Sequence, residues 1–245
     1  VTENTLRLLN FFEKEVPVAM GADKPLLIPF TDASDIHGKS GMEGYDLPEP
    51  KKELLLPEHA VNAMYRVIME SDEPVTLVPI ATLTNLALLF AMYPEVKAKI
   101  REIVMMGGSA SRGNKDVMSE FNVGTDPEAA QMVFQSGVPI VMAGLDVGLK
   151  AGLLPEDNEE LLRMGKVGDM AYHLFEKYRS KNFKMGLKMY DSCAIAYLLC
   201  PQMYQTQETY VEVELRGTLT AGCTVVDLDG CLGRKPNARV CTDVD

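Results

Sequence analysis

The sequence predicts an α/β fold in which a mainly parallel sheet carries helices on both faces. Short apolar stretches alternate with segments of helical period along most of the 245 residues. Parallel neighbours require crossover connections, so this alternation favours a parallel sheet covered on both sides. Hydrophobic residues make up 47% and charged residues 24% of the chain, which is typical of folded proteins.

The first seventy residues are predicted to hold a helix, a strand, a long loop and a second helix. Leucine and phenylalanine recur at nearly helical spacing over 5–13, and apolar residues follow an i, i+3, i+4, i+7 pattern within 58–70. The apolar run 16–20 ends at a glycine and predicts a buried strand. Residues 34–50 hold five glycines or prolines without periodicity, which predicts a long loop. Loops of this length are usually functional or disordered.

The remaining elements repeat the strand and helix unit. Strands are predicted over 75–80, 102–106, 138–143, 210–215 and 239–244, and helices over 83–92, 126–135, 169–178 and 192–199. The helix over 126–135 has clear end signals, with Asp126 as N-cap, Pro127 in the first turn and Gly137 after the last turn. Because we find no repeats, low-complexity runs or linker, we expect residues 1–245 to form a single domain.

Composition excludes several classes of partner. The formal net charge of −11 and the pI of about 4.8 predict that nucleic acid is not a partner, since no basic stripe offsets the repulsion of phosphates. No apolar stretch approaches the ~20 residues that span a bilayer, so we expect no membrane insertion. The five cysteines form an odd set without a CxxC pair, and no charged-then-apolar leader precedes the first helix. We therefore expect reduced thiols and a cytoplasmic location.

Polar segments follow four of the predicted strands, at 35–38, 81–85, 106–122 and 144–146. Ligands of open parallel sheets bind beyond the carboxyl ends of the strands. The segment 106–122 places Asn114, Glu120 and Asn122 within nine residues on a glycine-rich loop. Amides and a carboxylate can grip a polyhydroxy ligand, because they offer donors and acceptors to hydroxyls. The alternative is that these side chains cap turns and the helix that follows.

Asp191 and His37 each have two interpretations. Asp191 stands before an apolar helix, where we expect burial; its carboxylate either caps that helix or binds a hard cation. His37 is either a surface histidine of the long loop or a ligand contact. His59 and His173 lie within predicted helices and receive no role.

Six motifs follow one another along the chain. They are DIHGKSGMEG, LVPIATLTNLALL, VMMGGSASRGN, EFNVGTDPEAA, GLDV and YDSCAIAYL, beginning at residues 35, 77, 104, 120, 144 and 190. In sequence and order they resemble those of the inosine-uridine nucleoside hydrolases. The resemblance covers nearly the whole chain, and the tail 217–240 looks most like the less base-selective purine and pyrimidine branch. It implies a Rossmann-like fold, assembly as a homodimer or homotetramer, and hydrolysis of the N-glycosidic bond of ribonucleosides to free base and ribose. It also implies one Ca²⁺ that holds the attacking water and the ribose 2′ and 3′ hydroxyls.

The resemblance also implies a role for each candidate residue. Asp191 and the main-chain carbonyl of Ile80 correspond to Ca²⁺ ligands, and His37 to a histidine near the base. Tyr190 occupies the place where many members have a histidine that assists the leaving base. The ribose clamp corresponds to Asn114, Glu120 and Asn122, with Met106 packing nearby. Such a site must bind hydroxyls and position water, because the transition state resembles an oxocarbenium ion.

The chain departs from the family pattern in several places. It lacks the aspartate-rich DTDxGxDD segment, which in the family supplies most Ca²⁺ ligands, and it starts one helix late and stops before a terminal helix. Glu43, Thr82, Gly148 and Leu149 replace residues that are usual at the pocket rim. We expect that this sequence is an incomplete part of an active enzyme, truncated at both ends. The alternatives are a degenerate relative that serves as a nucleoside or ribose binding module or oligomer subunit, and a glycosidase for modified nucleosides.

Overall fold

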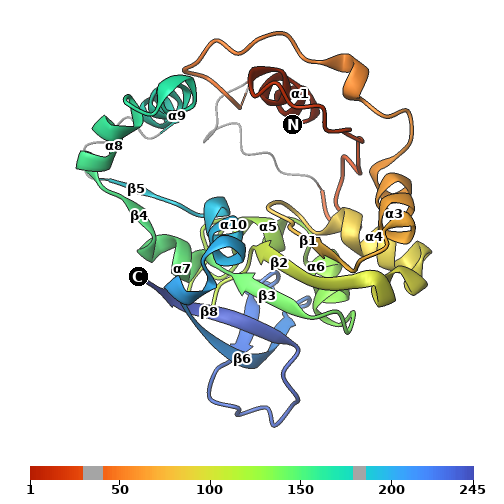
Figure 1. The fold of residues 1–245 in the computed structure, drawn as a ribbon. Helices are drawn as coiled ribbons and strands as arrows, with labels where there is room; N and C mark the ends of the chain where they lie inside the picture. The colour runs from red at the N-terminus through yellow and green to blue at the C-terminus, as the bar shows by residue number, and fades with distance from the viewer. Residues whose placement is uncertain (30–40, 179–185) are drawn as a thin grey trace. The chain divides into compact units, whose positions relative to one another are not determined.

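The computed structural model describes residues 1–29, 41–178 and 186–245 and divides the chain into two compact units (Figure 1). The first unit comprises Val1–Gly21, Thr31–Ala60 and Gly152–Lys188, and the second comprises Ala22–Phe30, Val61–Ala151 and Met189–Asp245. The single domain expected from the sequence stays a prediction. In the described ranges we find no helix with the length and apolar character to cross a membrane.

The first unit is built from helices and a minimal sheet. Its helices are α1 (Thr2–Phe11), α8 (Pro155–Leu161) and α9 (Gly165–Tyr178), with a 3₁₀ helix η1 (Lys52–Leu54). Strands β4 (Gly152–Leu153) and β5 (Leu187–Lys188) pair antiparallel. These bounds confirm the helices predicted over 5–13 and 169–178.

The strand predicted over 16–20 is wrong. Only Val18 makes an isolated parallel bridge, to Leu55. The segment that faces it turns as η1 just before Leu55, so it offers no extended edge along which a strand could pair. Of the predicted loop 34–50, residues 41–50 are described and contain no helix or strand, while 34–40 lie outside the described residues.

The second unit contains a six-stranded sheet in the order β1-β2-β3-β8-β6-β7. Strands β1 (Val75–Leu77), β2 (Ile100–Met106), β3 (Ile140–Ala143) and β8 (Ala238–Val244) run parallel. Strands β6 (Tyr204–Val213) and β7 (Thr224–Asp227) are antiparallel to their neighbours. The sheet is therefore mainly parallel, as predicted.

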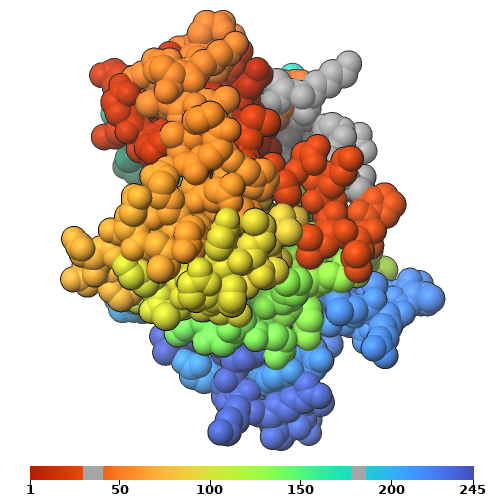
Figure 2. Space-filling model, turned by 90° about the vertical axis from the view of Figure 1, so that its right-hand side faces the viewer, coloured from red at the N-terminus to blue at the C-terminus, as the bar shows by residue number. Residues whose placement is uncertain are grey.

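Alternate residues of the central strands enter two separate apolar clusters, one on each face of the sheet. Ile103 and Met105 of β2 pack in a cluster that includes side chains of α3 (Ala60–Glu70), α4 (Thr84–Met92) and α6 (Pro127–Phe134). Val104 packs on the other face with α7 (Leu145–Lys150) and α10 (Asp191–Leu199). In Figure 2 the yellow surface of α4 adjoins the green surface around α6. Burial of each such side chain contributes about 1.5–3 kcal/mol to the free energy of folding.

The end signals of α6 are confirmed. Asp126 is the N-cap and its Oδ1 accepts from the Ala129 N–H at 3.2 Å, while Gly137 has a φ of +80° after the helix. The other oxygen of Asp126 accepts from Thr84 Oγ1 at 2.5 Å and from the Leu26 N–H at 2.9 Å. The same buried carboxylate therefore caps α6 and bonds the start of α4 and residue 26.

Candidate active site

The segments that follow β1, β2 and β3 meet at the carboxyl edge of the sheet. The Met106 N–H, at the end of β2, donates to the Pro79 carbonyl at 3.0 Å, and the Leu145 N–H after β3 donates to the Gly108 carbonyl at 2.8 Å. Ile80, next to Pro79, is 47% exposed, whereas Met106 is buried. Ligands of open parallel sheets bind beyond the carboxyl ends of the strands, so this is the edge at which we expect the ligand.

Two glycines let the chain turn tightly after β2. A Cβ on Gly107 would lie 2.9 Å from Met105 Cε, and one on Gly108 would lie 2.9 Å from Thr224 Cγ2. Gly108 also has a φ of +75°, which side chains rarely adopt. The turn directs the Gly108 N–H to Glu120 Oε2 at 2.9 Å.

Glu120 is a buried carboxylate, 2% exposed, at the N-cap of the short helix α5 (Phe121–Thr125). Its Oε2 accepts from the Asn122 N–H at 2.9 Å and the Val123 N–H at 3.1 Å, in addition to Gly108. Burial raises the pKa of Glu120 above its usual value, the backbone hydrogen bonds oppose that rise, and the negative charge of Asp191 adds to it. Because the charge of Asp191 affects this pKa, the two predicted site residues are close enough to interact electrostatically.

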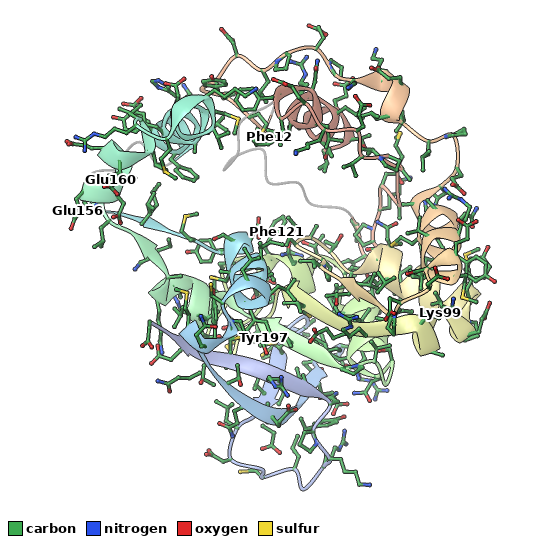
Figure 3. The ribbon with its side chains drawn as sticks, in the orientation of Figure 1. Phe12, Lys99, Phe121, Glu156, Glu160 and Tyr197 are labelled. Carbon is green, nitrogen blue, oxygen red and sulfur yellow. The ribbon has the colours of Figure 1, made fainter. Side chains whose placement is uncertain are left out.

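Both predicted asparagines bond to backbone groups, although Asn122 lies in helix α5 and not in a loop as predicted. Asn114 Oδ1 accepts from the N–H of Phe121, which Figure 3 labels, at 2.8 Å. Asn122 Nδ2 donates to the Met106 carbonyl at 3.0 Å and to Met106 Sδ at 3.4 Å. Asn114 and Glu120 together therefore satisfy the first three N–H groups of α5, as the capping interpretation predicts. Capping is compatible with ligand binding, because these bonds use Oδ1 of Asn114 and Oε2 of Glu120.

Asp191 is exposed, so the prediction that it is buried is wrong. Helix α10 meets the sheet through Cys193, Ala194 and Tyr197, which leaves its first residue outside the packed stripe. The N-cap position falls on Tyr190, so Asp191 is the first helical residue rather than the cap. A carboxylate in the first turn of a helix is stabilised by the helix dipole.

Tyr190 is half-buried and its ring packs on Gly148 of α7. A Cβ on Gly148 would lie 2.4 Å from Tyr190 Cδ1. The glycine that replaces the usual residue at the pocket rim therefore provides the space that this ring occupies. His37 lies outside the described residues.

The described residues do not fit a complete calcium site. Asp191 and the Ile80 carbonyl offer two oxygen groups, whereas Ca²⁺ takes roughly six to eight oxygen ligands. Within residues 1–29, 41–178 and 186–245, no group of three or more His, Cys, Asp or Glu side chains is placed to hold a metal ion.

The sequence did not single out three residues that bond to this loop. Asp146 accepts from Ser109 Oγ at 3.0 Å, and Thr224 Oγ1 accepts from the Ser109 N–H at 2.7 Å. Lys115 Nζ donates to the Gly124 carbonyl at the end of α5. The polar segment 144–146 after a strand was a signal for Asp146, whereas Thr224 belongs to a strand that the sequence did not predict.

Comparisons with known proteins agree with this architecture. The model of the inosine-uridine preferring nucleoside hydrolase family matches residues 1–245. A non-specific ribonucleoside hydrolase from Klebsiella pneumoniae is 48% identical over 244 residues, covering 100% of this chain and 80% of that protein. One from Salmonella newport is 47% identical, covering 100% and 79%.

Solved structures lead to the same group of proteins. The purine-preferring ribonucleoside hydrolase from Gardnerella vaginalis has a TM-score of 0.89 at 25% identity, covering 100% of this chain and 80% of that one. An inosine-guanosine nucleoside hydrolase has a TM-score of 0.89 at 27% identity, covering 100% and 82%. With the whole chain matched by the family model and nearly half its residues shared with curated relatives, the chain belongs to the inosine-uridine preferring nucleoside hydrolase family.

Proposed function

We propose that this chain hydrolyses the N-glycosidic bond of ribonucleosides and releases free base and ribose. The observation that carries the proposal is the buried Glu120 on the glycine-rich loop at the carboxyl edge of the sheet, in a chain of this family. The curated relatives are named non-specific ribonucleoside hydrolases, so we propose that both purine and pyrimidine ribonucleosides are substrates.

The proposed task of Asn114, Glu120 and Asn122 is to hold the ribose hydroxyls. Positive charge develops on the ribose as the glycosidic bond breaks, and a nearby ionised carboxylate stabilises it. Glu120 is almost fully excluded from water, so its interactions with a bound hydroxyl are stronger than they would be at the surface. The three N–H groups on Oε2 hold the carboxylate in place and leave Oε1 to accept from the ligand.

We propose that Tyr190 and His37 contact the departing base. A phenol has an unperturbed pKa of about 10 and imidazole one of about 6.5, so at neutral pH a tyrosine is the weaker acid. Tyr190 then assists the base by a hydrogen bond or by stacking more than by full proton transfer. The alternative is that Tyr190 only packs on Gly148.

Members of this family are metal-dependent hydrolases, and we propose Ca²⁺ as the ion. Asp191 and the Ile80 carbonyl are the proposed ligands among the described residues, and further oxygen ligands are needed to complete its coordination. When bound, the ion would orient the attacking water and the 2′ and 3′ hydroxyls.

We also propose a homodimer or homotetramer in the cytoplasm, acting on small ribonucleosides and on neither nucleic acid nor membranes. The five cysteines are all free thiols, which is compatible with a reducing compartment. Light scattering of the purified protein tests the assembly: a mass near 27.0 kDa, that of one chain, would contradict it.

The deciding experiment measures reducing sugar released from inosine, guanosine, adenosine, uridine and cytidine, with and without Ca²⁺. We expect release from purine and pyrimidine nucleosides that rises with Ca²⁺. Glu120→Gln, which keeps the shape of the side chain but removes its charge and replaces one acceptor oxygen with an NH2 donor, should lower kcat/KM for every nucleoside. Nucleoside binding by calorimetry without any sugar release would instead identify a binding module.

A further inference from the structure

The carboxylate of Asp146 receives three hydrogen bonds from one segment of the site loop. Asp146 is the second residue of α7, directly after β3, and is half-buried. Its Oδ2 accepts from Ser109 Oγ at 3.0 Å and from the Ala110 N–H at 2.6 Å, and its Oδ1 accepts from the Ser111 hydroxyl. Among the ion pairs of the described residues none involves Asp146. Its carboxylate is therefore stabilised by hydrogen bonds from neutral donors of residues 109–111.

Ser109 extends these bonds through the loop. This side chain is 3% exposed, and its Oγ also accepts from the Ser111 N–H at 3.2 Å and the Arg112 N–H at 3.1 Å. Thr224 Oγ1 accepts from the Ser109 N–H at 2.7 Å and donates to the Ser109 carbonyl at 2.5 Å. Hydrogen bonds from two side chains outside the loop, Asp146 and Thr224, therefore fix the conformation of residues 109–112.

Two hydrogen bonds of Gly108 connect the start of α7 to Glu120. The Gly108 carbonyl accepts from the N–H of Leu145, the residue before Asp146, at 2.8 Å. The Gly108 N–H donates to Glu120 Oε2 at 2.9 Å. The first turn of α7 thus holds residues 108–111 in place, and residue 108 in turn holds the buried carboxylate.

We propose that Asp146 is a positioning residue for this site, which sets where Glu120 and the neighbouring asparagines meet the ribose. The inference rests on the proposed function. Asp146 acts through the loop backbone and does not touch the substrate. A positioning error of about 1 Å in a group that holds the substrate costs up to about a hundredfold in rate. Loss of the Asp146 carboxylate should therefore impair the contacts of Glu120 and the asparagines with the ribose, in addition to any effect on folding.

Asp146→Ala and Asp146→Asn test the proposal, with Asp227→Ala as the matched control. Asp227 also accepts backbone bonds, from the N–H groups of Cys231 at 2.7 Å and Leu232 at 2.8 Å. It is the last residue of β7 and pairs in register with Tyr210 of β6. The control therefore removes a similar hydrogen-bonded carboxylate whose side chain bonds to residues 231 and 232 instead of to the site loop.

Two measurements are made on each variant. Asp146→Ala should raise KM for every nucleoside, and the inhibition constant of ribose, by on the order of tenfold or more. Amide hydrogen exchange should rise over 108–112 and extend to 121–123, because Glu120 loses its alignment. Asp146→Asn should keep most of the wild-type values, since its carbonyl still accepts from Ser109 and Ala110 while the Ser111 hydroxyl can turn to accept.

A merely structural role would reduce the amount of active enzyme, and hence apparent kcat, without changing KM or the ribose constant. The proposal is overturned if Asp146→Ala matches Asp227→Ala in both constants, or if the increase in exchange stops at residue 112. Absence of sugar release by the wild-type protein contradicts the proposed function instead, and the exchange measurement then still tests the link from Asp146 to Glu120.

Discussion

Gly148→Ala should destabilise the protein even though it replaces glycine within a helix. The new methyl would lie 2.4 Å from Tyr190 Cδ1 and 3.2 Å from the Met189 carbonyl oxygen. Carbon atoms in contact prefer about 3.5–4.0 Å, so the tyrosine ring must retreat by about 1 Å or more. Overpacking of this kind typically costs about 1–3 kcal/mol, against a gain of about 1 kcal/mol from helix propensity. We expect a net loss of up to about 2 kcal/mol.

The assay is a double-mutant cycle with Tyr190→Ala, followed by urea unfolding of all four proteins. Without the ring, most of the clash disappears, and Gly148→Ala should leave the free energy of unfolding unchanged or raise it by up to about 1 kcal/mol through helix propensity. The coupling between the two positions should therefore exceed about 1 kcal/mol. An equal cost of Gly148→Ala in both backgrounds would refute the reasoning, because the ring could then not be its source.

Three further predictions concern the site. Burial raises the pKa of Glu120, so on acidification the ionised form that binds hydroxyls should be lost at a pH above the usual glutamate range. A plot of KM against pH should therefore rise on the acidic side, and Glu120→Gln should abolish that rise. The raised pKa also means that the stability contributed by Glu120 is present below its unfolded pKa and is lost as pH rises through its folded pKa. The 245-residue chain should bind Ca²⁺ more weakly than micromolar in calorimetry, since its described residues offer two proposed ligands; tighter binding would reveal ligands that we have not identified. With an aspartate-rich segment present, Tyr190→His should raise kcat/KM for inosine but not for nitrophenyl riboside, whose leaving group needs no proton, whereas equal effects would indicate binding or packing.

Local patterns predicted most of the regular elements. The helix over 126–135 was recognisable from Asp126, Pro127 and Gly137, and α6 forms with these residues in the expected places. The strand over 102–106 was recognisable from its apolar run, and β2 extends it by two residues. These signals depend on backbone torsion and on the period of burial, which neighbouring residues determine.

The wrong or missing elements depend on partners elsewhere in the chain. The apolar run at 16–20 predicts a strand, but it has one bridge residue because the facing segment turns as η1 just before Leu55. Helices α5 and α7 have five and six residues, too few for a period of 3.6 to be recognised. The exposure of Asp191 follows from which side of α10 packs on the sheet, and a sequence that is apolar nearly all round does not reveal that side.

The candidate site divides in the same way. The sequence by itself determined that Asn114, Glu120 and Asn122 lie close together, because they fall within nine residues of chain, and that Asp191 opens an apolar helix. The tertiary structure decided that Ser109 bonds to Asp146, 37 residues away, and to Thr224, 115 residues away. The physical reason is strand order: β3 pairs beside β2, and β8 and β6 follow it in the sheet, only when the whole sheet assembles, so hydrogen bonds between their connecting segments have no signature in any local pattern.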